Sequence, residues 1–271
     1  MTEPEASVPP PSRTPTFFHR FAQHLRRQDW FAVVIELLIV VLGVFLGLQV
    51  NEWAADRADQ RRGEMYVERL VADLQTDLQR RQELVAYYDA VFDSAERTYA
   101  MLSDPASDNR ALVINAYRAS EYNYSPPTSA TWDEIVSSGD LSLLPTPALE
   151  GASAYFRDDT ARTVSEPLRQ SLYRQTVRSL LPHEVQRAIR ESCSDVLDSQ
   201  NQITGFRQDC DLDVAVAAID AAAGALRSDP QVLSSLRYHF STVANARINL
   251  RADVIFIEGA LGALRDRSPD R

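Results

Sequence analysis

The sequence predicts an all-α protein: an N-terminal transmembrane helix that continues into a long helix, followed by an extracytoplasmic helical bundle. Three observations lead to this class. Residues 30–52 form one apolar segment long enough to cross a bilayer. Two long segments after it repeat apolar residues every three to four positions. No stretch alternates polar and apolar residues for long enough to predict a strand.

Two short segments precede the apolar segment. Residues 1–16 are expected to be a disordered arm, and residues 17–29 an amphipathic juxtamembrane segment with apolar side chains on one helical face. The apolar members are Phe17, Phe18, Phe21 and Leu25, and the cationic members are His19, Arg20, His24, Arg26 and Arg27. This pattern suits a helix in the headgroup layer, and a simple basic flank explains it equally well.

Residues 30–50 contain only Glu36 and Gln49 as strongly polar residues. As a helix they extend about 31 Å, which matches a hydrocarbon core of about 30 Å. A cleavable signal peptide is the alternative interpretation. However, 29 residues precede the segment, and Glu52 and Trp53 occupy positions where signal cleavage requires small residues. The sequence therefore predicts a retained transmembrane helix over 30–52.

The unusual residues of this segment fall on one stripe of the helix. At 100° per residue, Gly43 and Gly47 flank Glu36 closely, and Asn51 lies about 60° away. Paired glycines permit close approach of another helix, and an intramembrane carboxyl normally faces protein. The stripe therefore predicts a helix partner, either a second copy or another protein. The alternative is that Glu36 is protonated or reaches the headgroups and that the glycine pair arose by chance.

The orientation of the span rests on its flanks. Equal numbers of arginines stand before and after it, namely Arg20, Arg26 and Arg27 against Arg57, Arg61 and Arg62. A short basic arm usually stays in the cytoplasm while a long following domain is translocated largely regardless of its charge. We therefore expect a single-pass protein of the bacterial inner membrane, with a cytoplasmic N-terminus and a periplasmic main domain at 53–265.

Two motifs resemble an uncharacterised family of bacterial single-pass membrane proteins. The first runs from Glu36 through Gly43, Gly47, Gln49 and Asn51 to Trp53, followed by Glu68-Arg-Leu-Val-Ala-Asp-Leu74; Gly47 stands where the family usually has alanine. The second is Thr131-Trp-Asp-Glu-Ile-Val-Ser-Ser-Gly-Asp-Leu-Ser-Leu-Leu144. The resemblance implies a membrane-anchored, mostly helical protein without an assigned activity, and it implies no catalytic residue.

The body begins and ends with predicted long helices that carry coiled-coil repeats. The first helix is expected to run unbroken to the stop at Ser103-Asp-Pro105, and the second to begin at Asp229-Pro230. The expected contact positions on the first are Val67, Leu74, Tyr88, Ala95 and Leu102 with Val71, Leu78, Val85, Phe92 and Tyr99. Those on the second are Leu233, Phe240, Val254 and Leu261 with Leu236, Val243, Leu250, Ile257 and Leu264. The two helices are expected to pack together, and residues 266–271 to form a disordered tail.

Each repeat is interrupted by one arginine, Arg81 in the first and Arg247 in the second. An antiparallel alignment with Val67 opposite Leu264 places Arg247 level with residue 84, one turn from Arg81. Two guanidiniums so placed predict a shared anion site. Alternatively, each stem packs while its charged head reaches Asp77, Glu83 or solvent.

Shorter helices are expected between the two long ones. The first spans 109–120, and a loop at 122–128 follows it. Thr131 and Glu134 predict a capping box for a short helix closed by Gly139. Thr146-Pro147 opens a further helix, proline interrupts the chain at 167 and 182, and an alanine-rich helix is expected over 213–226.

The two cysteines, Cys193 and Cys210, predict a disulfide if the compartment is oxidising. Nearby acids also allow a weak calcium-loop interpretation, in which Asp209, Asp211, Asp213 and Asp220 stand at positions 1, 3, 5 and 12. The alternative is that they precede and begin a helix whose positive end they complement, because Val214 occupies the turn position that needs glycine. No other metal and no cofactor is expected.

Composition excludes several functions. A net charge of −10 without a clustered basic face argues against nucleic-acid binding, and the absence of lysine excludes Schiff-base chemistry and a Walker lysine. His183-Glu184 lacks the second histidine of a zinc protease, and His239 is expected to be partly exposed. The leading hypothesis is a non-enzymatic interaction or scaffold module within an envelope complex. Its expected partners are the lipid bilayer and a helix in the membrane. An extracytoplasmic ligand sensor that acts through a partner is the second hypothesis, and an enzyme the third.

Overall fold

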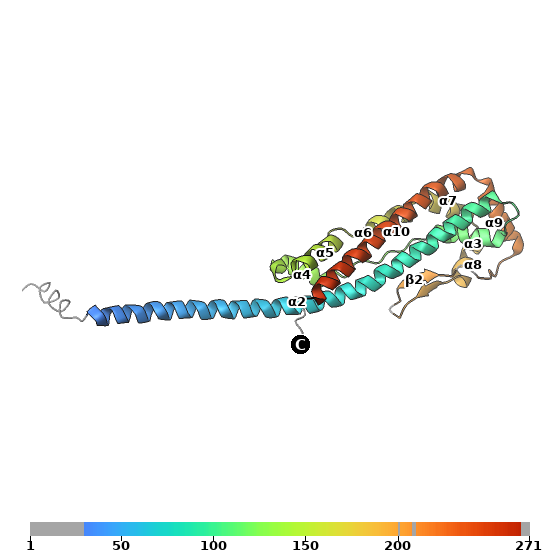
Figure 1. The fold of residues 1–271 in the computed structure, drawn as a ribbon. Helices are drawn as coiled ribbons and strands as arrows, with labels where there is room; N and C mark the ends of the chain where they lie inside the picture. Colours follow the sequence, from blue (N-terminus) through green and yellow to red (C-terminus); the bar gives the residue numbers. More distant parts are fainter. Residues whose placement is uncertain (1–29, 200, 208–209, 267–271) are drawn as a thin grey trace, which may run out of the picture. The chain divides into compact units, whose positions relative to one another are not determined.

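The computed structural model describes residues 30–199, 201–207 and 210–266, and it is predominantly helical. The expected arm, juxtamembrane segment, Asp209 and most of the tail lie outside these residues. Residues up to Gln60 and residues from Arg61 onward form two units, which are described separately. The helices and strands named below are labelled in Figure 1.

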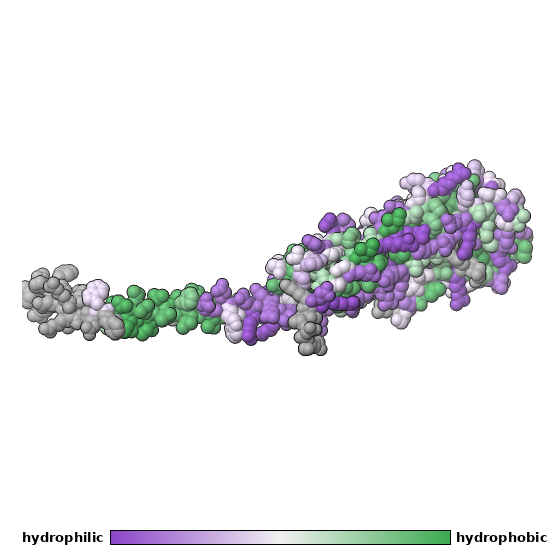
Figure 2. Space-filling view, viewed as in Figure 1, coloured by the Kyte–Doolittle hydropathy of each residue, from purple (hydrophilic) through white to green (hydrophobic). Residues whose placement is uncertain are grey.

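Helix α2 spans Trp30–Ser103, as the sequence predicts. Its first part belongs to the first unit, and Figure 2 shows an apolar stretch there that is followed by a hydrophilic one. Within the described residues, α2 is the one helix long and apolar enough to cross a membrane, judged by length and composition. Its apolar side chains are exposed throughout this part; Leu37 and Leu48, for example, are 63% and 64% exposed.

The second unit combines the rest of α2 with helix α10 (Pro230–Arg265) and shorter helices that cover them. The bounds of the shorter elements are α3 Asn109–Ala119, α4 Ala130–Ser138, η1 Asp140–Leu143, α5 Thr146–Phe156, α6 Thr160–Arg169, α7 Leu172–Leu180, α8 His183–Ser192 and α9 Val216–Ser228. Several begin at side-chain caps: Asp108, Asp159, Ser171 and Asp229 each accept a hydrogen bond from a backbone N–H of the first turn.

The expected capping box of α4 is wrong. Ser129 is the N-cap, and its side chain makes no capping hydrogen bond, while Gly139 ends the helix in the left-handed conformation with φ of 77°. Both side chains of the expected box are used for tertiary contacts instead. Thr131 donates a hydrogen bond to Asp73 of α2, and Glu134 accepts one from Arg69 at 2.7 Å.

The contact face of the two long helices is also displaced by one residue from the expected one. Three of the ten expected positions on α2 are buried (Leu74, Tyr88 and Ala95), and six of the nine on α10. At the other positions neighbouring residues are buried instead, and several of these are polar. These include Asp77, Ser94 and Thr98 on α2, and Ser235, His239 and Asp253 on α10. Hydrophobicity alone favoured Val71, Leu78 and the other apolar residues of the expected repeat. Val71 and Leu78 are instead half-buried beside the contact face.

The core of this unit consists of three apolar clusters along its length. One gathers α4, α5 and the end of α10 around Leu70 and Leu74; a second packs α6 against the middle of both long helices; the third joins α3, α7, α8 and α9 to the start of α10. A short antiparallel hairpin, β1 Asp195–Leu197 and β2 Ile203–Phe206, adjoins the third cluster's α8. Strands this short are below what periodicity can detect.

Candidate functional site

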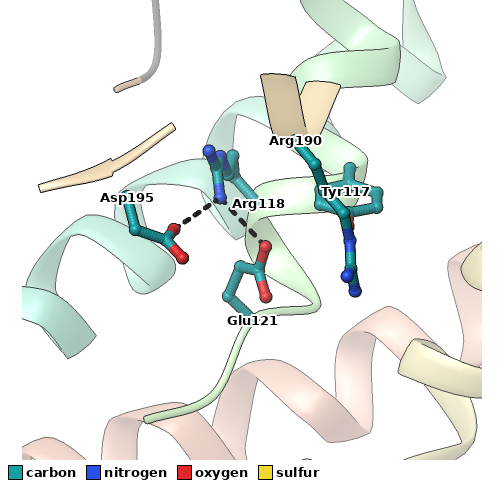
Figure 3. Close-up of a pocket in the computed structure, with 5 residues that line it drawn as sticks. All are labelled: Tyr117, Arg118, Glu121, Arg190 and Asp195. Carbon is teal, nitrogen blue, oxygen red and sulfur yellow. Dashed lines mark hydrogen bonds and ion pairs between the residues drawn. The ribbon is translucent and has the colours of Figure 1, made fainter. Parts of the chain in front are cut away.

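A cavity of about 320 Å³ lies where α3, α8 and β1 meet, and five residues line it: Tyr117, Arg118, Glu121, Arg190 and Asp195. Helix α3 supplies Tyr117 and Arg118 near its C-terminal end, α8 supplies Arg190, and β1 supplies Asp195. Figure 3 shows Arg118 between the two carboxylates and Arg190 beside Tyr117. The site is therefore assembled from residues up to 78 positions apart in sequence.

Arg118 is the buried cation of this cavity, with only 3% of its side chain exposed. Its Nη1 lies 2.9 Å from Glu121 Oε1 and 3.4 Å from Asp195 Oδ1, and its Nη2 donates to the carbonyl of Cys193. The guanidinium also lies over the Phe206 ring, 4.8 Å from its centroid. These contacts fix the charge in one position, although Arg118 Nε has no hydrogen-bond partner among the described residues.

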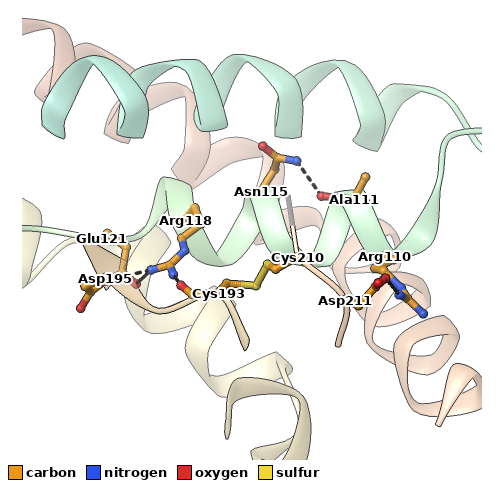
Figure 4. The surroundings of a disulfide bond; sticks show 9 residues. All are labelled: Arg110, Ala111, Asn115, Arg118, Glu121, Cys193, Asp195, Cys210 and Asp211. Atoms are coloured by element: carbon orange, nitrogen blue, oxygen red, sulfur yellow. Dashed lines mark hydrogen bonds and ion pairs between the residues drawn. A yellow bond between two sulfur atoms is a disulfide. The ribbon is translucent and has the colours of Figure 1, made fainter. Parts of the chain in front are cut away.

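A disulfide holds the carbonyl that Arg118 binds. Cys193 and Cys210 are bonded, with their Cα atoms 5.4 Å apart, as the sequence predicts. Figure 4 shows this bond beside the Arg118 cluster, with Cys193 at the end of α8. The bond closes the chain around the β1–β2 hairpin, and hence also constrains Asp195.

Two arginines of α7 extend the cationic cluster. Arg178 stacks on Tyr117 at 3.3 Å from the ring centroid, donates through Nε to Ser120 Oγ at 2.8 Å, and lies 3.0 Å from Glu121 Oε2. Arg174 donates to the Ser120 carbonyl at 2.5 Å. The i,i+4 spacing puts both on one face of α7. Burial lowers the pKa of Arg178, although Glu121 partly opposes this.

Arg190 differs from the other three arginines in its partners. Its Nε donates to Tyr117 Oη at 2.8 Å, and this hydrogen bond is the main cause of its raised pKa. Among residues 30–199, 201–207 and 210–266, no carboxylate lies within ion-pair distance of it. Arg190 therefore presents a guanidinium to the cavity whose charge is not neutralised by a direct contact.

A second cavity, of about 660 Å³, adjoins the first and shares Glu121, Arg190 and Asp195 with it. Its other walls are mainly tyrosine and arginine: Tyr87, Tyr122 and Tyr124 with Arg162, Arg169 and Arg174. Arg174 lies over the Tyr122 ring, 4.8 Å from its centroid. The two cavities together form a polar depression with an aromatic side.

The cluster reverses the charge of the chain locally. Four arginines (Arg118, Arg174, Arg178 and Arg190) surround two carboxylates (Glu121 and Asp195), which leaves two positive charges in excess, whereas the whole chain carries −10. Sequence analysis missed this site, because each arginine alone is typical of a solvated helix face. The available signal was the pair at 174 and 178.

The predicted shared site at Arg81 and Arg247 is not brought together. Arg81 is buried and lies 3.3 Å from Asp253 Oδ2, whereas Arg247 pairs with Asp89 at 2.5 Å. The antiparallel alignment thus differs by three to five residues from the expected one, since Arg81 pairs with Asp253 and Arg247 with Asp89 rather than lying level with residue 84. Each guanidinium has its own carboxylate, but these are Asp253 and Asp89 rather than the Asp77 or Glu83 of the alternative interpretation. Arg81 is also buried and does not reach solvent.

Arg81 belongs to a buried polar network that links α2, α5 and α10. It donates to Tyr155 Oη at 3.1 Å, and Tyr155 in turn donates to Asp77 Oδ2 at 3.1 Å. Asp77 also accepts two hydrogen bonds from Thr128, at 2.7 and 2.8 Å. Burial raises the pKa of Asp253, and Arg81 counteracts this.

The other predicted residues are separated. Asp211 pairs with Arg110 at 2.8 Å, and Asp220 accepts from Asn109 at 2.7 Å. In the described part of the chain, no three His, Cys, Asp or Glu side chains are grouped so as to hold a metal ion; Asp209 lies outside that part, and Asp213 belongs to no such group. His239 is buried rather than partly exposed, and contacts the Ala119 carbonyl at 2.8 Å.

The predicted membrane contact residues Glu36, Gly43, Gly47 and Asn51 all lie on the exposed first part of α2. A Cβ atom added at Gly43 or Gly47 would meet no other atom within 4 Å.

Comparison of the chain with protein-family models, with curated proteins and with solved structures gives no significant match.

Proposed function

We propose that the chain is a membrane-anchored, non-enzymatic helical interaction module, in which residues 30–52 cross the bacterial inner membrane and the helical unit lies in the periplasm. The observation that carries this proposal is the exposure of the apolar part of α2. An isolated helix covered with leucine, isoleucine and valine is unfavourable in water, and a bilayer removes that surface from water. The disulfide adds support for the compartment, because such bonds persist in oxidising environments.

The anchor also offers a face to a partner helix. Gly43 and Gly47 leave the backbone open on one stripe, and Glu36 stands on the same stripe. Replacing both glycines with isoleucine, and separately Glu36 with leucine, is expected to reduce association in a membrane helix-association reporter. Val41→Ile is a matched control, because at 100° per residue Val41 lies about 140° around the helix from Glu36, away from the stripe that carries the glycine pair. Unchanged association in both test variants would mean that the anchor only tethers the chain.

The membrane topology of the chain determines in which compartment the helical unit lies. A reporter enzyme fused after Arg271 is expected to be active only if it is of the kind that works outside the cytoplasm. Activity of a cytoplasm-only reporter at that position would refute the periplasmic assignment. Crosslinking in native membranes, followed by mass spectrometry, then tests the interaction role, which requires recurrent protein partners.

A second candidate function is an extracytoplasmic ligand-binding domain that acts through a partner. The arginine cluster around Tyr117 favours it, because that cluster joins two cavities and carries an excess of positive charge in an acidic chain. The purified full chain in detergent is expected to retain a bound small molecule, which native mass spectrometry would detect. A ligand-free chain from native membranes would favour the interaction module alone.

A further inference from the structure

We propose that the cavity between Arg118 and Arg190 binds a small organic dianion, such as a dicarboxylate or a phosphate monoester. This inference rests on the second candidate function and identifies the chemical class of its ligand. The shared chemistry of these ligands is a compact group of anionic oxygens. Guanidinium groups bind such oxygens through paired N–H donors.

The charge of the cluster sets the charge of the ligand. Two arginines and two carboxylates line the first cavity, whereas the first and the adjoining cavity together are lined by five arginines and three carboxylates. The two positive charges in excess over the joint site match a dianion. The arginines are Arg118, Arg162, Arg169, Arg174 and Arg190, and the carboxylates are Glu121, Glu166 and Asp195. Such an excess is unfavourable in an empty site, because the guanidiniums repel one another at short range. A dianion removes this repulsion, whereas a neutral ligand does not.

The donors are held in place before a ligand arrives. Arg174 is fixed by the Ser120 carbonyl and the Tyr122 ring, and Arg118 by the Cys193 carbonyl and its two carboxylates. Arg190 lines both cavities, and within the described ranges its guanidinium has no carboxylate at ion-pair distance. Donors that are already ordered lose little entropy on binding, which favours affinity for a small ligand.

The adjoining cavity indicates where the rest of the ligand lies. Tyr87, Tyr122 and Tyr124 line it, and it opens from the same Arg190 and Asp195. An anionic group at Arg190 would thus leave the carbon skeleton of the ligand beside tyrosine rings. The volumes of about 320 and 660 Å³ fall within the usual range for small-molecule sites.

Isothermal titration of the full chain in detergent micelles, at low ionic strength and pH 7.5, tests the proposal with two probes, succinate and inorganic phosphate. Both are expected to bind at one site per chain. Arg190→Gln is expected to weaken binding about tenfold, which corresponds to loss of one charge-assisted hydrogen bond to an exposed donor. Arg187→Gln is the matched control, because Arg187 lies exposed on the same helix and does not line either cavity.

A second variant gives an effect of opposite sign. Asp195→Asn removes a competing carboxylate from Arg118 without changing its shape, and is expected to strengthen binding about threefold. A merely structural role for this cluster would not raise affinity. Equal affinity in Arg190→Gln and Arg187→Gln, or no binding of either probe at 10 mM of the probe, would overturn the inference. The topology and crosslinking results would be unaffected, so failure here is distinguishable from failure of the anchored-module proposal.

Discussion

Replacing Arg81 with methionine is expected to lower the free energy of unfolding by about 3 to 5 kcal/mol, because it leaves a buried carboxylate without its cation. Arg81 and Asp253 are 3% and 4% exposed, so water cannot replace the lost partner. The variant also removes the hydrogen bond from Arg81 to the Tyr155 hydroxyl. That bond positions the hydroxyl, which in turn donates a hydrogen bond to Asp77. The long apolar stem is retained in methionine, so little packing is lost.

Arg247→Met is the matched control for this variant. Arg247 also stands on a long helix and pairs with an aspartate, but its side chain and that of Asp89 are 21% and 37% exposed. Asp89 in addition keeps Arg251 at 3.0 Å. Loss of this more exposed pair is expected to cost about 1 kcal/mol or less. Urea denaturation of both full-length variants in detergent, followed by circular dichroism, measures the difference.

The penalty of Arg81→Met is expected to depend on pH. Burial raises the pKa of Asp253 above its ordinary value of 3.8, so its ionisation destabilises the fold as pH rises through that window. Loss of Arg81 raises this pKa further, and the carboxyl then stays neutral at higher pH. The variant should therefore lose less stability at pH 5 than at pH 8, and Asp253→Asn should rescue part of the loss at pH 8. A penalty equal to that of Arg247→Met, or one that does not change with pH, would refute the reasoning.

Three further predictions concern stability. Burial lowers the pKa of His239 to about 4, so the free energy of unfolding is expected to fall as pH decreases from 6.5 through 4. The loss should reach about 3 kcal/mol relative to His239→Gln, which has no titrating group at this position. Equal pH profiles of the two proteins would contradict this. Gly151→Leu should destabilise the fold by about 1 to 3 kcal/mol, because a Cβ there would lie 3.0 Å from the Ala260 backbone. Gly262→Ala should stabilise the fold by about 0.5 to 1 kcal/mol, because a Cβ at Gly262 meets no atom within 4 Å. Thermal denaturation measures both changes. Reduction of Cys193–Cys210 should cost about 3 kcal/mol in urea, and two free thiols in unreduced, denatured protein from the envelope would disprove the bond.

Several ends of the helices could be predicted from the sequence, because local chemistry determines them, although the start of α4 could not. Asp229-Pro230 begins α10, Ser103 ends α2, and Gly139 closes α4 as expected. The contact face of the long helices could not, since hydrophobicity ranks Leu78 above Asp77. Asp77 is buried only because Thr128 and Tyr155, from distant parts of the chain, satisfy its oxygens.

The arginine cluster shows the same limit at the level of the site. Arg118, Arg178 and Arg190 come from three helices, and no spacing relates them in sequence. Their convergence depends on how α3 packs against α7 and α8 within one apolar cluster. The disulfide, in contrast, could be predicted, because only two cysteines exist and no alternative pairing within the chain competes.

The Arg81–Asp253 pair has a consequence for alternative pairings of α2 and α10. Both helices bury residues at heptad spacing, so sliding one along the other by seven residues would again match apolar side chains over most of their length. Such a slip would place Arg81 opposite Ala246 or Ala260, and Asp253 opposite Leu74 or Tyr88, with both charges buried and unpaired. The pair therefore penalises slipped states, and together with the other buried polar residues it favours the native alignment of the two helices.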